Sequence, residues 1–158
     1  MLPEHIVGKR VLYGCLDWGY GHFARSIPLL IQLQEQGNKV VFLGTEDQFE
    51  LLCSYGFSGD FAVLTPTGFR FRGDGNFKGE AFRNIGILRK AIQRDRKRLA
   101  ELVRNLSPQL IISDHRYGLR FKGIPSVFVT HQTSLPPGSG WLANRIHRLW
   151  MKRFDAIW

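Results

Sequence analysis

Short, continuous apolar runs alternate with longer amphipathic stretches along this chain of 158 residues. Apolar runs without polar alternation are typical of parallel strands covered on both faces. The stretches between them repeat apolar residues at helical spacing. We therefore predict an α/β fold, a Rossmann-like doubly wound parallel sheet. The expected strands are 10–16, 39–43, 61–64, 110–113, 126–130 and 155–158, and the expected helices are 22–36, 46–55, 80–106 and 141–154.

The composition fits one globular domain with a sizeable core. Hydrophobic residues make up 44% and charged residues 22% of the chain, which excludes a disordered protein. No apolar stretch approaches the ~20 residues that span a bilayer, and the N-terminus lacks the apolar core of a signal peptide. We expect a cytoplasmic protein in which Cys15, in a strand, and Cys53, in a helix, are reduced core thiols.

The segment between the first expected strand and helix reads Leu-Asp-Trp-Gly-Tyr-Gly-His-Phe-Ala-Arg, residues 16–25. Glycines let a ligand approach the backbone, and the unpaired N–H groups of a helix start favour negative charge. His22 adds a group capable of proton transfer. We interpret His22 as a candidate base and the neighbouring residues as substrate-binding: Asp17, Trp18, Gly19, Tyr20, Gly21 and Arg25.

Two other interpretations of this segment stay open. Gly19-x-Gly21-x-x-Ala24 also fits the dinucleotide fingerprint, with Glu46 as the acid that binds the ribose. Against it, bulky residues stand where the pyrophosphate of a dinucleotide needs bare backbone. The segment is otherwise an ordinary strand–helix turn with a surface histidine, an interpretation that leaves its cluster of large polar residues unexplained.

Polar residues also follow two later expected strands. Asp114, Arg116 and Tyr117 come after the strand at 110–113, and His131 and Gln132 after the strand at 126–130. Ligands of such sheets bind at the carboxyl ends of the strands. Singly, Asp114 fits a loop-capping carboxylate and His131 a core histidine. Together they predict one crevice shared with His22.

The formal net charge of +9 indicates an anionic partner or surface. Nucleic acid, an anionic membrane and a phosphorylated substrate are each compatible with it, as is a merely solvated basic face. The cations are concentrated on the two later helices and on the loop at 65–78: Arg83, Arg89, Lys90, Arg94, Arg96, Lys97, Arg98, Arg104; Arg145, Arg148, Lys152, Arg153; and Arg70, Arg72, Lys78.

Three stretches of the chain resemble one family: Leu-Asp-Trp-Gly-Tyr-Gly-His, Ser-Asp-His-Arg-Tyr-Gly and Phe-Val-Thr-His-Gln. They are similar to the N-terminal domain of GT-B glycosyltransferases. Within these they resemble the group of the lipid-linked N-acetylglucosaminyltransferase and the diacylglycerol galactosyltransferases, in an uncharacterised bacterial branch. The resemblance extends from about residue 9 to residue 158.

The resemblance implies a function. Residues 1–158 would form the Rossmann-like, acceptor-binding half of an enzyme that moves a sugar from a nucleotide-sugar donor to an acceptor hydroxyl. His22 would be the general base, with Asp114 orienting it. Such enzymes are usually metal-independent, and no metal or other cofactor is expected. Substrate-binding roles are expected for Arg116, Tyr117, His131 and Gln132.

The chain departs from the family in one respect, because it contains no second Rossmann domain to bind most of the donor. We therefore expect a truncated acceptor domain that is inactive alone. A lipid-linked acceptor would suit a peripheral position on the inner face of the plasma membrane, through Phe69, Phe71 and Phe77 and the basic helix at 141–153. The alternative is a non-catalytic basic module that binds a nucleotide or nucleic acid, although no specific nucleic-acid motif supports it.

Overall fold

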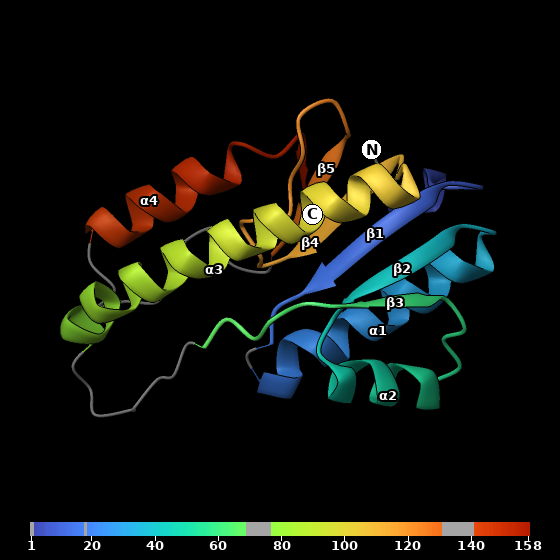
Figure 1. Cartoon of the computed structure of the whole chain (residues 1–158), viewed down its shortest axis with the longest axis horizontal. Coiled ribbons are helices and arrows are strands. Elements are labelled where there is room, and N and C mark those ends of the chain that lie inside the picture. The colour runs from blue at the N-terminus through green and yellow to red at the C-terminus, as the bar shows by residue number, and fades with distance from the viewer. Residues whose placement is uncertain (1, 18, 69–76, 131–140) are drawn as a thin grey trace.

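The computed structural model describes residues 2–17, 19–68, 77–130 and 141–158, and at 19, 20, 22, 77–85, 142 and 143 it describes the backbone alone. Its six strands form one parallel sheet in the order β3-β2-β1-β4-β5-β6 (Figure 1). The strands are β1 (Arg10–Cys15), β2 (Lys39–Gly44), β3 (Asp60–Val63), β4 (Leu110–Asp114), β5 (Ser126–Val129) and β6 (Ala156–Ile157). The predicted Rossmann-like class is confirmed.

Four α-helices connect these strands: α1 (Gly19–Glu35), α2 (Glu46–Ser54), α3 (Phe77–Leu106) and α4 (Trp141–Met151). Two helices begin three residues before their predicted starts. The glycines of the first segment therefore belong to the first turn of α1 and not to a turn that precedes it. Helix α4 ends sooner than predicted, because the chain turns sharply there: the Phe154 amide donates to the Met151 carbonyl at 3.0 Å. A short 3-10 helix at Pro3–His5 was not predicted.

The helices divide between the two faces of the sheet. Successive side chains of a strand point to opposite faces. Val11, Tyr13 and Cys15 accordingly pack in one core cluster, with apolar residues of α1 and α2. Leu12 packs in a second cluster with residues of α3, among them Leu99. Phe128 of β5 packs against the end of α4.

The two cysteines lie in contrasting environments. Cys15 is buried, as predicted, but Cys53 is exposed, so the prediction of two core thiols was wrong for Cys53. Helix α2 packs on the sheet through fully buried Leu52, and the next residue along the helix points away from that contact. Burial, and secondarily Asp114, raises the pKa of the Cys15 thiol from 9.0 to about 12.

We predict that a thiol reagent at pH 8 labels Cys53 rapidly and Cys15 only on unfolding. The thiolate is the reactive form, and a pKa near 12 leaves about one Cys15 in 10⁴ ionised at that pH. Mass spectrometry should show one fast label, which Cys53→Ser abolishes. Rapid labelling of Cys15 in the native protein would contradict the buried position. The folded state also keeps a proton that the unfolded thiol loses near pH 9.0, so the free energy of unfolding should fall as the pH rises from about 9 to about 12.

Candidate functional site

The strand order reverses between β1 and β4, and the carboxyl ends of these two neighbours form the candidate site. Asp17 follows β1, and Asp114 is the last residue of β4. The two ends are held together, since the Leu16 amide donates to the Asp114 carbonyl at 3.0 Å. A reversal of this kind is where open α/β sheets bind ligands.

Asp114 directs its carboxylate toward α1. It follows Leu110 and Ile112 at the two-residue period of a strand, and both of these pack in the cluster that includes α1. Asp114 is buried, and the Ser26 hydroxyl of α1 donates to its Oδ2 at 2.7 Å. The same hydroxyl lies 3.5 Å from the Cys15 sulfur. The carboxylate is therefore held against the inner face of α1.

His22 lies in the first turn of α1, as predicted, and its side chain is outside the described residues. Position 22 precedes Ser26 by four residues, and residues at this spacing share one face of a helix. The side chain of Tyr20 and the whole of Trp18, His131 and Gln132 also lie outside the described residues. The crevice joining His22, Asp114 and His131 stays a prediction.

Arg116 forms the centre of a buried polar network below this edge. Its guanidinium is buried and bonds Asp95 twice, from Nε to Oδ2 at 3.1 Å and from Nη2 to Oδ1 at 2.8 Å. Nη2 also donates to the Thr65 carbonyl at 3.0 Å, and Nη1 lies 4.0 Å from Asp17 Oδ1. Burial raises the pKa of the Asp95 carboxyl, while the charge of Arg116 opposes that rise.

Asp95 was not predicted as a site residue, although the sequence carries a signal for it. Asp95 continues the apolar stripe of α3 between Ile92 and Leu99, at the spacing of one helical face. A carboxylate in such a stripe needs a buried cation. Gly118 makes this approach of α3 feasible, since a Cβ there would lie 2.5 Å from Asp95 Cβ and 2.8 Å from the Ile92 carbonyl oxygen.

Asp17 holds the start of the loop that follows β3. The Thr67 amide donates to Asp17 Oδ2 at 2.9 Å, and the Thr67 hydroxyl donates to Oδ1 at 2.8 Å. Arg94 of α3 donates to the Pro66 carbonyl at 3.4 Å. Together with the bond from Arg116 to Thr65, these contacts fix residues 65–67 at the carboxyl edge of the sheet.

The remaining predicted substrate-binding residues differ in exposure. Tyr117 stacks on Phe128 with ring centroids 5.2 Å apart, and its hydroxyl lies 2.6 Å from His147 Nδ1. Burial raises the pKa of this phenol. Arg25 is exposed, and its Nε donates to the Gly21 carbonyl at 3.1 Å. The structure thus buries Arg116 beneath the edge, leaves Tyr117 partly exposed and places Arg25 on the surface.

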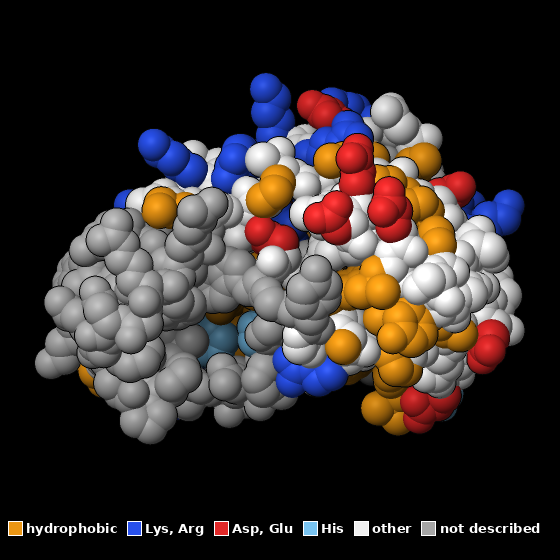
Figure 2. Space-filling model, turned by 90° about the horizontal axis from the view of Figure 1, so that it is seen from below, with side chains coloured by type: hydrophobic (Ala, Val, Ile, Leu, Met, Phe, Trp, Pro, Cys, Tyr) orange, Lys and Arg blue, Asp and Glu red, His pale blue; other side chains and the backbone are white. Residues whose placement is uncertain are grey.

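A hollow of about 620 Å³ opens at the carboxyl ends of β1, β2 and β3. It is lined by Asp17, by Phe23 of α1, by the start of α2 and by residues 63, 64 and 66. Thr45 and Gln48 form a capping box there, and the Gln48 side chain also donates to the Leu16 carbonyl at 3.1 Å. Figure 2, which views the molecule from the side of α1 and α2, shows acidic side chains gathered together, while most Lys and Arg lie toward one rim.

Among the residues that the structure describes, no three His, Cys, Asp or Glu side chains are grouped so as to hold a metal ion. None of the helices in the described part of the chain has the length and apolar character needed to cross a membrane.

We predict that Arg116→Met lowers the free energy of unfolding by about 3–5 kcal/mol, because it leaves the Asp95 carboxylate buried without its partner. Arg98→Met is the matched control. It removes an exposed ion pair with Glu101 and should cost less than about 1 kcal/mol. Urea unfolding measures both.

Replacing both partners, in Asp95→Leu/Arg116→Met, should recover much of the loss, since the Asp95 carboxylate is then no longer buried without its partner. The network has no structural importance if Arg116→Met costs no more than the control.

Comparisons with known proteins give a structural likeness and no match in sequence. No family model matches the chain. No curated protein matches it either. Among solved structures it is similar to SsfS6, a glycosyltransferase of Streptomyces sp. SF2575, at 16% identity and a TM-score of 0.62, covering 90% of this chain and 43% of that one.

Two further structures are similar to it. The glycosyltransferase VinC, in complex with dTDP, has 16% identity and a TM-score of 0.57, over 91% of this chain and 39% of that one. UGT2 of Phytolacca americana, in complex with UDP-2-fluoro-glucose and pterostilbene, has 18% identity and a TM-score of 0.54, over 77% of this chain and 30% of that one. The chain thus spans less than half the length of these structures. Its fold is the Rossmann-like α/β fold of a domain of GT-B glycosyltransferases.

Proposed function

We propose that this chain is the acceptor-binding domain of a GT-B glycosyltransferase. The complete gene product would transfer a sugar from a nucleoside diphosphate sugar to a hydroxyl group of an acceptor. VinC binds dTDP, and the Phytolacca enzyme binds a UDP-sugar, which supports a donor of this class. The observation that carries the proposal is the Asp114 carboxylate, buried at the switch point of the sheet and held against α1 one turn after His22.

In this proposal His22 is the general base. A helix N-terminus disfavours the imidazolium and keeps the imidazole neutral, so that it can accept the proton of the acceptor hydroxyl. Asp114 on the other ring nitrogen would fix the tautomer and stabilise the imidazolium as it forms. The bond from Ser26 to Asp114 supports this role, because it fixes the carboxylate on the face of α1 that position 22 shares.

Gly21 supports a ligand at the first turn of α1. It is exposed, and a Cβ placed there would meet no described atom within 4 Å. Glycine costs about 1 kcal/mol relative to alanine inside a helix, and packing against described residues does not require it. Close approach of a diphosphate to the backbone amides of this turn would explain why glycine occupies the position.

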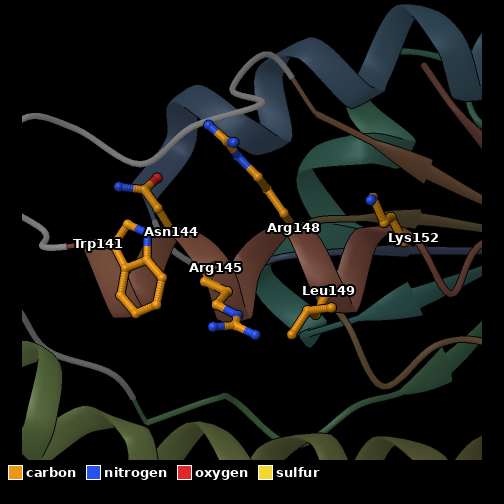
Figure 3. Close-up of a pocket in the computed structure, with 6 residues that line it drawn as sticks. All are labelled: Trp141, Asn144, Arg145, Arg148, Leu149 and Lys152. Atoms are coloured by element: carbon orange, nitrogen blue, oxygen red, sulfur yellow. The ribbon is translucent and has the colours of Figure 1, made fainter.

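The acceptor would lie in the hollow at the ends of β1, β2 and β3, next to α1. In the proposal the acceptor is lipid-linked, and α4 contacts an anionic leaflet on the cytoplasmic side. Trp141 and Leu149 of α4 are 71% and 52% exposed, so Leu149 does not face the sheet. The Arg145 guanidinium lies 5.2 Å from the centre of the Trp141 ring. Figure 3 shows these residues on α4 together with Arg148 and Lys152, a combination typical of an interfacial helix.

We predict that His22→Ala in the complete gene product lowers kcat at least about 100-fold, the lower range of general-base assistance. His5→Ala, at an exposed histidine of the N-terminal 3-10 helix, is the control and should leave turnover unchanged. Asp114→Asn should cost less than His22→Ala, since it changes the orientation of the base and not the base itself. Circular dichroism verifies folding. Turnover like that of the wild type in His22→Ala would exclude the general-base role.

We predict that Gly21→Ala changes stability and activity in opposite directions. The free energy of unfolding of the isolated chain should rise by about 0.5–1 kcal/mol, because alanine is the better helix former and its methyl group has free space there. The complete gene product should show a higher KM for the donor, because the added methyl group blocks the approach of the diphosphate. A stabilised variant with an unchanged KM would show that Gly21 is not part of the donor-binding site.

We predict that the domain sediments with vesicles rich in anionic lipid and not with neutral vesicles. At 1 M salt, where the screening length is about 3 Å, part of this binding should persist through inserted apolar groups. Trp141→Ser/Leu149→Ser should remove that persistent part. Phenylalanines 69, 71 and 77, proposed for the same role, lie outside the residues with described side chains, and Phe77 belongs to α3 and not to the predicted loop. Absence of any lipid preference at low salt would refute membrane contact.

A further inference from the structure

A second hollow, of about 260 Å³, lies between α3 and the end of α4, on the face of the sheet opposite α1. Three arginines surround it: Arg89 and Arg96 of α3, and Arg153 just after α4. Gln93 contributes an amide to the wall, and Tyr117 and Trp150 contribute aromatic rings. We call this the three-arginine hollow.

The positive charge of the three-arginine hollow is not neutralised within the described part of the chain. Neither an aspartate nor a glutamate is among the described residues that line it. The nearest acid along α3, Asp95, is bound by Arg116 on another face of the helix. The ion pairs found among described residues involve Arg98 and Arg116, and none involves the three arginines of the hollow. Three guanidinium groups around one cavity favour an anion strongly.

The arrangement is built by regular elements and a packed floor. Arg89 and Arg96 stand seven residues apart, which is close to two helical turns, so they project from one side of α3. The Tyr117 and Trp150 rings are 5.0 Å apart. Tyr117 is fixed further by Phe128 beneath it and by its hydroxyl contact with His147. A fixed floor reduces the ordering that a ligand would have to impose.

The size of the hollow favours a small ligand. At about 260 Å³ it is smaller than the ~300–1,000 Å³ typical of pockets for larger organic ligands. Guanidinium groups bind phosphate oxygens in pairs of parallel hydrogen bonds. We propose that the three-arginine hollow binds a phosphate or diphosphate group. The hollow lies on the opposite face from the Asp114 carboxylate, so it is separate from the proposed transfer site and does not depend on it.

Calorimetric titration of the 158-residue chain with inorganic pyrophosphate tests this site. We expect saturable binding that weakens with salt. Arg89→Gln/Arg96→Gln/Arg153→Gln should weaken it at least about tenfold, since the charge-assisted bonds are lost. The matched control Lys90→Gln/Lys97→Gln/Arg104→Gln removes the same charge from α3 outside the hollow, and it should change affinity by less than about threefold.

Absence of pyrophosphate binding, or an equal loss in both triple variants, overturns the proposal. Equal loss would mean that diffuse basic charge is sufficient. Competition separates the two sources of the phosphate group. If phosphatidic acid vesicles displace pyrophosphate and phosphatidylserine vesicles of equal charge do not, the site takes a lipid phosphomonoester. If neither displaces it, the site takes a soluble phosphate or diphosphate. Both results support the anion site, and neither depends on glycosyl transfer.

Discussion

The buried guanidinium of Arg116 connects four segments that are far apart in the sequence. It bonds Asp95 of α3 and the carbonyl that follows β3, and it lies near the carboxylate that follows β1, while Arg116 itself belongs to the turn after β4. A buried charge is costly unless its hydrogen bonds are made. Asp95 of α3 and the Thr65 carbonyl accept the hydrogen bonds of Nε and Nη2, whereas the buried Nη1 has no hydrogen-bond partner among the described residues and lies 4.0 Å from Asp17 Oδ1. Buried contacts of Arg116 thus hold the carboxyl edge of the sheet in place without a ligand.

The contacts that hold the loop after β3 and those that hold the Asp114 carboxylate lie on opposite faces of the sheet. Asp17 and Arg116 fix the loop at 65–67, whereas Ser26 fixes the Asp114 carboxylate on the opposite face of the sheet. Positioned groups of this kind are what a reaction between two bound substrates requires, because small displacements are costly for rate. The acidic start of α2 lies beside the candidate acceptor hollow, whereas α3 is rich in lysine and arginine.

The parallel sheet could be predicted from the sequence because its strands are largely buried on both faces, which leaves continuous apolar runs such as those at 40–43 and 110–112. Helix starts were less predictable, since Gly19 and Gly21 were interpreted as a turn and not as helix. The role of Arg116 could not be derived, because its partner Asp95 lies 21 residues away on a helix that carries many other charged residues. Spacing along a sequence does not show which charge is buried. The sequence predicted that the candidate site lies at a set of strand ends. Only the contacts of Asp114 show that its carboxylate faces α1.

The central position of β1 has a consequence for how this chain folds. β1 pairs with β2 on one side, but on the other side with β4, where Val11 lies beside Leu110. During synthesis the half-sheet β1-β2-β3 is complete about fifty residues before β4 emerges, which at roughly 5–20 residues per second is an interval of several seconds. Throughout that interval one edge of β1 exposes unpaired backbone groups, a template for pairing with another chain. Slow translation of α3 would therefore favour aggregation of the nascent protein, and a chaperone that covers this edge would oppose it.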